Sequence, residues 1–312
     1  MQLTTNTRAF IEAEQYSKFI LLNLHDGLLP ESFYRNVSDF GSGDTLHIKT
    51  IGTVTIQEAA EDTPLTYNPI ESGEITMQIS EYVGDAWYVT DDLREDGDQV
   101  DALMAARSQE STRAFQENFE TKFLSVCNAA QTDADANEIN GFAHRIASAK
   151  TNNVFGIEHL NAMRLAFQKA NVPESGNIFI CDPVVEATLN GLVTITNDVT
   201  PFAERIIKEG MTSGMRYVMS IFGWTIFANN RLPRGTFSDG TTSITDGVAN
   251  VCMNIMDDQT KPVMMAWRRM PKSEGERNKD LARDEFVVRS RYGFGVQRLD
   301  SLGIIITSAV NY

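Results

Sequence analysis

The chain has 312 residues, of which 42% are hydrophobic and 22% charged, so it folds as a globular protein of two lobes or one elongated domain. Its formal net charge of −15 repels the phosphates of nucleic acid, which argues against a role in direct nucleic-acid binding. No apolar run approaches the roughly 20 residues of a membrane span, and residues 1–5 lack the features of a secretory signal, so we expect synthesis in the cytoplasm and no membrane contact.

The N-terminal region predicts an amphipathic helix over residues 8–24. Gly27 and Pro30 follow this segment and are typical of the end of a helix. The apolar positions of the predicted helix are Phe10, Ile11, Phe19, Ile20, Leu22 and Leu24.

Two strand patterns then flank an acidic excursion. Residues 46–56 have strand-like apolar positions, and residues 75–89 alternate apolar and polar side chains along one long strand, with a bend expected at Gly84. Residues 57–73, between the two patterns, are acidic and contain no lysine or arginine. A loop of this length inside a compact domain usually has a partner or a function. We therefore predict the two arms of an extended hairpin.

The clearest element is a long helix that starts at Asp98, a suitable N-cap, and continues to Ala130 without glycine or proline. Phe115, Phe119 and Phe123 recur every four residues, so they share one face, which we expect to pack in the core. About 30 residues at 1.5 Å each give a helix about 45 Å long, whereas a 100-residue domain has a radius of gyration of only about 13 Å. The helix must act as a strut across an elongated or flat molecule.

The rest of the sequence predicts a mixed lobe, which makes the fold class α+β. We expect a helix over residues 156–170, a buried strand over Asn177–Cys181 and a second helix from Pro183, which suits the first helical position. Residues 194–215 are polar enough for a loop or a short helix. Further strands are expected at residues 216–228, 248–256, 264–267, 286–288 and 303–307, with the charged stretch 268–285 interrupting them.

Motifs for catalysis or metal binding are weak. The three cysteines and four histidines are scattered, and none lie at metal-ligand spacing, so we expect no metal and no cofactor. Cys181 beside Asp182 could be the nucleophile of an α+β enzyme, but its apolar neighbours favour a buried strand cysteine. The carboxylates from Asp91 to Asp101 do not match a calcium-binding loop, so a solvated helix start or an acidic contact surface is preferred over a cation site.

Charge is segregated along the chain. Residues 57–120 hold 16 Asp and Glu against 3 Lys and Arg, a net of −13, while residues 261–298 hold 10 Lys and Arg against 5 Asp and Glu, a net of +5. Both regions could be solvated faces. Alternatively, the acidic region of one copy meets the basic region of the next, and such head-to-tail contacts propagate into rings and larger arrays.

An ordered set of short segments carries a family resemblance over nearly the whole chain. These segments, with the long helix between them, are Leu24–Pro30, Phe40–Leu46, Thr63–Tyr67, Tyr88–Leu93, Ala266–Arg268 and Val288–Val296. In this order they resemble the HK97-fold major capsid proteins of tailed double-stranded DNA phages, closest to those of short-tailed, T7-like marine phages.

The resemblance implies a fixed order of parts. An N-terminal arm would comprise residues 1–45, an extended β-hairpin loop residues 46–90, and a peripheral domain with a long spine helix residues 91–176. A mixed axial domain would comprise residues 177–260, and residues 261–312 would return to the peripheral domain as C-terminal strands. The implied function is self-assembly into the hexamers and pentamers of an icosahedral head that encloses the genome, a structural role and not an enzymatic one.

The resemblance also implies partners. Residues 1–45 are too short for a cleaved scaffolding extension, which implies a separate scaffolding protein, besides a portal and DNA packaged without sequence-specific binding. Some relatives cross-link a lysine of the extended loop to an asparagine, but residues 57–93 contain no lysine, so no such link is expected. The shell would then depend on non-covalent contacts, with a separate cement protein as a further candidate partner, and the chain would reside in the virion capsid.

The extended loop and the N-terminal arm are expected to lie across neighbouring subunits, with the basic C-terminal region of one copy accepting the acidic loop residues of another. The acidic residues are Glu58, Glu61, Asp62 and Glu71, and the basic residues are Arg268, Arg269, Arg277 and Arg283. Two other functions stay open from the sequence. One is an encapsulin-type nanocompartment shell, which uses the same fold, and the other is the enzyme based on Cys181 and Asp182.

Overall fold

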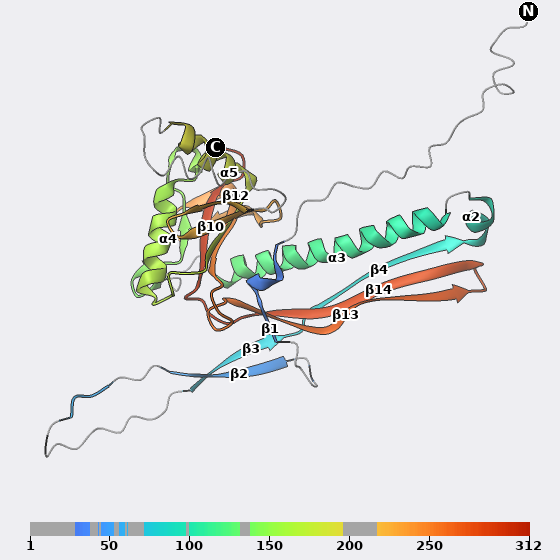
Figure 1. The fold of residues 1–312 in the computed structure, drawn as a ribbon, viewed down its shortest axis with the longest axis horizontal. Helices are drawn as coiled ribbons and strands as arrows, with labels where there is room; N and C mark the ends of the chain where they lie inside the picture. The colour runs from blue at the N-terminus through green and yellow to red at the C-terminus, as the bar shows by residue number, and fades with distance from the viewer. Residues whose placement is uncertain are drawn as a thin grey trace, which may run out of the picture.

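The computed structural model has a mixed lobe at one end, from which a long helix and a long sheet extend side by side (Figure 1). A separate hairpin projects from the base of the sheet in the opposite direction. The structure describes residues 29–37, 43, 45–52, 56–59, 61, 72–97, 100–131, 138–195 and 217–312. Among these, only the backbone is described at residues 31, 96, 190–195 and 217–221.

A seven-stranded mixed sheet forms the centre of the lobe. Six of its strands lie in the spatial order β7 (Arg145–Ala147), β15 (Leu302–Ser308), β12 (Ser243–Asn254), β8 (Asn177–Cys181), β10 (Trp224–Ala228) and β9 (Tyr217–Ile221). The seventh, β11 (Arg234–Ser238), pairs with the N-terminal half of β12. β7 runs parallel to β15 and β10 parallel to β8, whereas the other neighbouring strands are antiparallel.

The two faces of this sheet are covered by different helices, because successive side chains of a strand point to opposite sides. Phe179 of β8 belongs to one buried cluster with Leu160 of α4 (Ile157–Lys169) and Val185 of α5 (Pro183–Ile195). Ile180, the next residue of β8, belongs to the opposite cluster with Leu124 of α3 (Val100–Ala130). The lobe is therefore a sheet between two helices on one side and the end of the long helix on the other.

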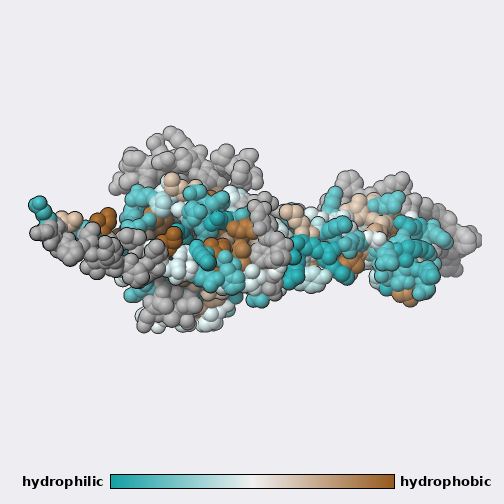
Figure 2. Space-filling model, turned by 90° about the horizontal axis from the view of Figure 1, so that it is seen from below, coloured by the Kyte–Doolittle hydropathy of each residue, from teal (hydrophilic) through white to brown (hydrophobic). Residues whose placement is uncertain are grey.

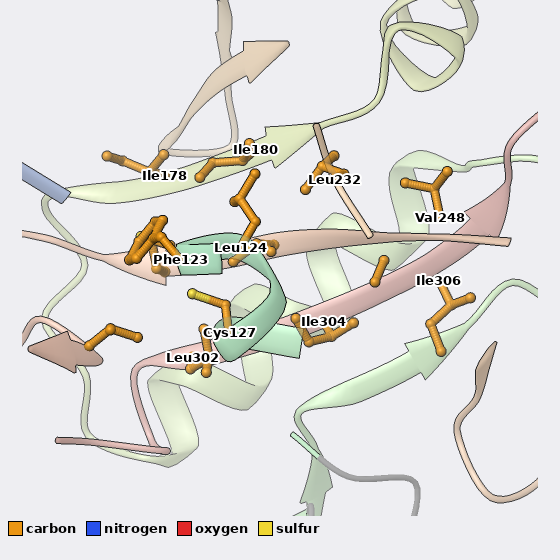
Figure 3. Packing of buried hydrophobic residues seen from close by; sticks show 14 of the residues in the cluster. Phe123, Leu124, Cys127, Ile178, Ile180, Leu232, Val248, Leu302, Ile304 and Ile306 are labelled. Carbon is orange, nitrogen blue, oxygen red and sulfur yellow. The ribbon is translucent and has the colours of Figure 1, made fainter. Parts of the chain in front are cut away.

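Helix α3 has 31 residues, and its last turns enter the lobe. There Phe123, Leu124 and Cys127 are buried against residues of β8, β12 and β15 (Figure 3). Outside the lobe the helix is more exposed, and Leu103 near its start is 51% exposed. Burial thus anchors one end of α3 and leaves the other end to extend from the lobe.

A four-stranded sheet runs alongside the exposed part of α3 (Figure 1). Its order is β1 (Arg35–Asn36), β13 (Val263–Asn278), β14 (Arg283–Val296) and β4 (Glu81–Thr90), and α2 (Asp91–Asp96) follows β4 at the far end. The Phe119 ring stacks on Trp267 with 5.3 Å between ring centroids and lies 5.1 Å from Tyr292 and 4.9 Å from Phe294. This aromatic group attaches the base of the sheet to α3.

The projecting hairpin consists of β2 (Thr45–Ile51) and β3 (Ser72–Gln78), paired antiparallel through seven residue pairs. Its base is attached to the four-stranded sheet because Met77 is buried against Gly295, where a Cβ atom would lie 2.7 Å from the Met77 side chain. Its outer end is exposed, with Ile51 at 81% and Ile56 at 96%. Short elements complete the described fold, namely η1 (Glu31–Phe33), β5 (Glu138–Ile139), β6 (Phe142–Ala143) and η3 (Thr151–Asn153).

Most of the predicted elements are confirmed. The α+β class, the long helix ending at Ala130, the helix α4, the fully buried strand β8 and the helix starting at Pro183 all occur where the sequence predicts them. Phe123 is in the core as expected, while Phe115 and Phe119 are half-buried toward the sheet. The predicted helix over residues 8–24, the cap at Asp98 and nearly all of residues 194–215 lie outside the described residues.

The prediction that residues 268–285 interrupt the strands is wrong. β13 and β14 form one long hairpin through this charged stretch, with register shifts between Trp267 and Lys272. Residues 270–277 of β13 are all exposed, so they lack the alternation of apolar and polar residues by which a strand is recognised. Pairing with β14, which in turn pairs with β4, holds this part of β13 in place.

Two further strand boundaries are corrected. The strand predicted over residues 75–89 divides at Ile79 and Ser80 into β3 and β4, which belong to different sheets. The strand predicted over residues 216–228 is a hairpin of β9 and β10, because Phe222 and Gly223 both have positive φ and form the turn. Continuous apolar patterns in the sequence concealed both interruptions.

Replacing Leu124 by alanine should show how strongly α3 is anchored. Leu124 is fully buried between α3 and the seven-stranded sheet, so Leu124→Ala should lower the free energy of unfolding by about 2–5 kcal/mol. Leu103→Ala, at an exposed position of the same helix, should change it by less than about 0.5 kcal/mol. Urea unfolding of unassembled subunits followed by circular dichroism measures both, and equal stabilities would contradict the described anchoring.

Candidate inter-subunit surfaces

The β2–β3 hairpin presents an uncovered surface. Within the described residues its two strands pair only with each other, and an isolated two-stranded hairpin is marginally stable in water. Glu58 and Glu61, two of the residues expected to contact another subunit, are exposed beyond β2, whereas Asp62 and Glu71 lie outside the described residues. The hairpin therefore offers exposed apolar and acidic groups to whatever covers it.

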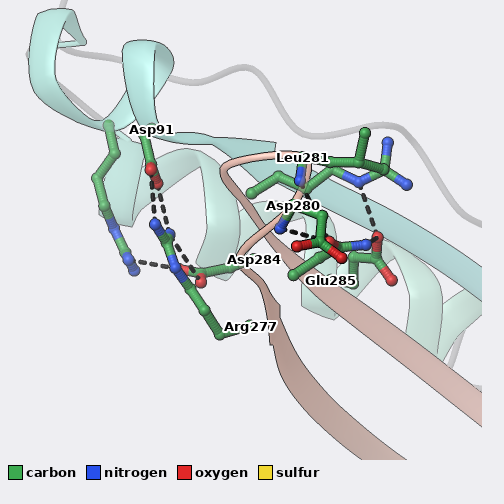
Figure 4. Close-up of polar contacts among 9 residues, drawn as sticks. Asp91, Arg277, Asp280, Leu281, Asp284 and Glu285 are labelled. Atoms are coloured by element: carbon green, nitrogen blue, oxygen red, sulfur yellow. Dashed lines mark hydrogen bonds and ion pairs between the residues drawn. The ribbon is translucent and has the colours of Figure 1, made fainter.

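Arg277, expected to contact another subunit, is paired within its own chain at the far end of the four-stranded sheet (Figure 4). Arg283, expected to do the same, is also paired within its own chain. Arg277 donates to both carboxylate oxygens of Asp91, at 2.5 and 2.6 Å, and lies 3.3 Å from Asp284. Arg283 lies 2.7 Å from Glu285, and its guanidinium lies 4.5 Å from the centre of the Tyr88 ring.

The pairing at this end involves three elements. Arg94 of α2 donates to Asp284 of β14 at 2.5 Å, so the arginines of α2 and β13 share one acceptor. The hydrogen bond from Arg277, with the charges of Arg277 and Arg94, lowers the pKa of Asp91 despite partial desolvation. The network therefore fixes α2 to the β13–β14 hairpin, and part of the acidic run from Asp91 to Asp101 has a role within the chain.

A different group of cations gathers on the sheet face that points away from α3. Partners in antiparallel strands share a face, and the register pairs Arg269 with Arg291 and Lys272 with Arg289. Tyr292 and Ser290, the alternate residues of β14, line the side facing α3, so Arg291 and Arg289 point to the other side. Of these four cations, Arg269 lies 2.6 Å from Glu274.

We call Arg269, Lys272, Arg289 and Arg291 the basic face. In the part of the chain that the structure describes, Lys272, Arg289 and Arg291 have no carboxylate within ion-pair distance. Sequence reasoning missed these three, since their common face depends on the register of two strands of which it predicted only residues 264–267 and 286–288. Arg268, one of the residues expected from the sequence to contact another subunit, is exposed next to the register shift of β13. Figure 2 shows that hydrophilic residues predominate toward the far end of the molecule.

The residues considered for catalysis are buried inside the lobe. Cys181 is fully buried, and desolvation, with the nearby carboxylates Glu186 and Asp182, raises the pKa of its thiol well above the ordinary value. The thiolate that a nucleophile requires is therefore disfavoured. Asp182 is also fully buried, where it accepts hydrogen bonds from Arg234 at 2.9 Å and from the backbone of Val184 at 3.1 Å. These contacts fix the start of α5 and the chain after β10.

The described residues also bear on membrane insertion and on metal binding. None of the described helices is both long and apolar enough to cross a membrane. Among the same residues, no three His, Cys, Asp or Glu side chains are grouped so that they could hold a metal ion.

The sequence and the fold are similar to those of known phage capsid proteins. The model of the phage capsid protein family matches residues 73–307. The capsid of the cyanophage P-SCSP1u has 19% sequence identity and a TM-score of 0.67, over 97% of this chain and 94% of that chain. The mature capsid of bacteriophage PhiM1 has 13% identity and a TM-score of 0.69 over 97% and 93%, and the capsid of the cyanophage Pam1 has 13% and 0.67 over 100% and 99%. No curated protein matches the sequence.

The long helix beside a four-stranded sheet, the mixed lobe and the projecting hairpin define an HK97-like capsid fold, shared with these phage capsids. The chain belongs to the phage capsid protein family, whose model covers more than half of its length. It is a major capsid protein, a structural subunit of the icosahedral shell that forms the phage head.

The role of Arg277 within the chain can be tested by replacing it with glutamine. Because the folded-state pKa of Asp91 is lowered, its ion pair stabilises the far end of the sheet above the ordinary carboxyl pKa and is lost as pH falls through the lowered value. Arg277→Gln should return the Asp91 pKa toward its ordinary range and speed hydrogen exchange in α2. Carboxyl NMR titration and hydrogen exchange measure these effects, with Lys279→Gln as the control; an unchanged Asp91 titration would contradict the pairing.

Proposed function

We propose that the head assembles through contacts in which a neighbouring subunit covers the β2–β3 hairpin. The observation that carries this proposal is the exposure of Ile51 and Ile56 on a hairpin that pairs only with itself within the described residues. Large apolar side chains in this position gain free energy when another surface covers them. Repetition of one heterologous contact around an axis closes a ring, which fits hexamers and pentamers as the units of the shell.

The parts of the subunit are proposed to follow the domain order of the family. The N-terminal arm, residues 1–45, and the extended loop, residues 46–90, lie across neighbouring subunits in the shell. The peripheral domain, residues 91–176, contains α3 as its spine, and the axial domain, residues 177–260, surrounds the symmetry axes. Residues 261–312 return to the peripheral domain, which is supported by the packing of Tyr292 and Phe294 of β14 against Phe119 of α3.

The basic face is the proposed acceptor for the acidic part of the hairpin loop. We therefore modify the basic side of the pairing expected from the sequence. In that pairing the acidic residues Glu58, Glu61, Asp62 and Glu71 contact Arg268, Arg269, Arg277 and Arg283. Arg269, Arg277 and Arg283 each have a carboxylate partner in their own chain. Lys272, Arg289 and Arg291 of the basic face are therefore the proposed acceptors. Each exposed ion pair contributes only about 0–1 kcal/mol, so these contacts set the register of subunits more than the stability of the shell.

The proposed role of the subunit also includes its partners and the absence of an enzymatic activity. The subunit has no enzymatic activity, is synthesised in the host cytoplasm, and assembles with a separate scaffolding protein and a portal. The outer part and the returning strand of the loop, within residues 57–93, contain no lysine, and Lys49 of β2 is the only lysine in residues 46–90. We propose that the shell is held by non-covalent contacts, with a cement protein as a further partner. An acidic protein surface would also let packaged DNA move without adhering to the shell.

Reversing charge on the basic face tests the proposed contact. Lys272→Glu combined with Arg289→Glu should reduce the yield of closed particles several-fold, because each copy would repel the acidic loop of its neighbour. Adding Glu58→Lys and Glu61→Lys should restore part of the yield. Negative-stain electron microscopy, with scaffolding protein present, counts the particles.

The matched control carries the same change of charge elsewhere. Lys169→Glu with Lys279→Glu alters two exposed lysines outside the basic face and should assemble like the unmodified chain. Equal particle yields for the two double variants would refute the basic face as the acceptor. Failure of the unmodified chain to form any particle with its scaffolding protein would refute the shell itself.

A further inference from the structure

An apolar cleft of about 420 Å³ lies between α3 and the four-stranded sheet. Phe115 and Phe119 of α3 form one wall, and Trp267 of β13 and Tyr292 of β14 form the other. Met270, which is 63% exposed, also lines the cleft. A cavity of this size falls in the range of about 300–1,000 Å³ that accepts a small ligand, so it has room for a few large apolar side chains.

The described chain begins at the cleft. Leu29 and Pro30 line it, followed by Phe33 at the end of η1 and by Tyr34. Upstream, residues 8–24 carry the apolar positions of the predicted amphipathic helix, and only residues 25–28 separate this segment from Leu29. A linker of four residues spans at most about 14 Å, so it keeps the apolar segment near the cleft.

We propose that, in the unassembled subunit, residues 8–24 of the same chain dock in this cleft with their apolar face against Phe115 and Trp267. A short linker gives the segment an effective concentration in roughly the millimolar range, which favours docking in the same chain over docking in a second, dilute copy. Docking would remove from water the apolar side chains of the segment and those of the cleft walls. This inference concerns the free subunit and goes beyond the shell contacts proposed above, in which the arm crosses to a neighbour.

A disulfide test distinguishes docking in the same chain from docking in a second copy. The three native cysteines are buried, so new cysteines at Leu22 and Met270 can be oxidised selectively. Dilute unassembled subunits carrying Leu22→Cys and Met270→Cys should give a link within one chain, seen as faster migration on a denaturing, non-reducing gel. The control pair places the second cysteine at Leu281, 57% exposed in the turn between β13 and β14, and should link at least about tenfold less.

Two variants test whether the apolar contact causes the link. Phe19→Asp, within the docking segment, should reduce the Leu22–Met270 link about tenfold without disturbing the core, and Phe115→Asp should do the same from the cleft side. Leu103→Asp, at an exposed position of α3, is the control and should leave the link unchanged. Circular dichroism checks the fold of each variant.

Two results would overturn the inference. Equal links in the Met270 and Leu281 pairs would show that the segment does not dock in the cleft, and predominant links between chains would assign the cleft to the segment of a second copy. Particle formation by the reduced variants is scored separately by microscopy. Loss of the intrachain link with normal particles would therefore refute the docking and leave the proposed shell contacts intact.

Discussion

The burial of the end of α3 in the lobe is the interaction on which the other parts of the molecule depend. The four-stranded sheet and the hairpin extend from the lobe, and their direction relative to it follows α3 (Figure 1). Arg145 of β7 reinforces this anchor by donating to the carbonyl oxygens of Gln131, at 2.7 Å, and Asn128, at 3.4 Å. The last carbonyls of a helix carry partial negative charge, so a cation placed there stabilises the helix end. Since β7 also pairs with β15, the same arginine links the strut to the central sheet.

A buried group of charges fixes α3 a few turns before its end. Arg231, on the chain after β10, lies 2.7 Å from Glu117 and 3.0 Å from Glu120, and Asn229 donates to Glu120 as well. Glu120 is only 5% exposed, and a buried charge is costly unless it is paired. Such a network adds little net stability compared with an apolar contact, but it tolerates only one arrangement of its partners. It therefore sets the rotation of α3, and with it the side of the helix on which Phe119 receives the sheet.

The sequence was informative where local pattern and tertiary burial agree. The long helix has no glycine or proline, and β8 is apolar on both faces because helices cover both sides of the sheet, so both were predictable. The β13–β14 hairpin was not, because its outer part is exposed and its charges carry no periodic signal. The contact between Asp91 and Arg277 joins residues 186 positions apart, and no local rule predicts such a pair. The basic face was hidden for the same reason, since four cations become neighbours only after the register of two strands is known.

The positions of the two charged surfaces agree with the proposed contact between copies of the subunit. The β2–β3 hairpin extends away from the β13–β14 hairpin, which carries the basic face (Figure 1). Beyond about 10 Å, opposite charges in water are largely screened at moderate ionic strength, so distant surfaces of one rigid chain do not satisfy each other. A second copy can bring an acidic loop to the basic face, and it then presents its own free surfaces in turn. Growth by such contacts stops only when the array closes on itself, and an icosahedral shell is a closed array of this kind.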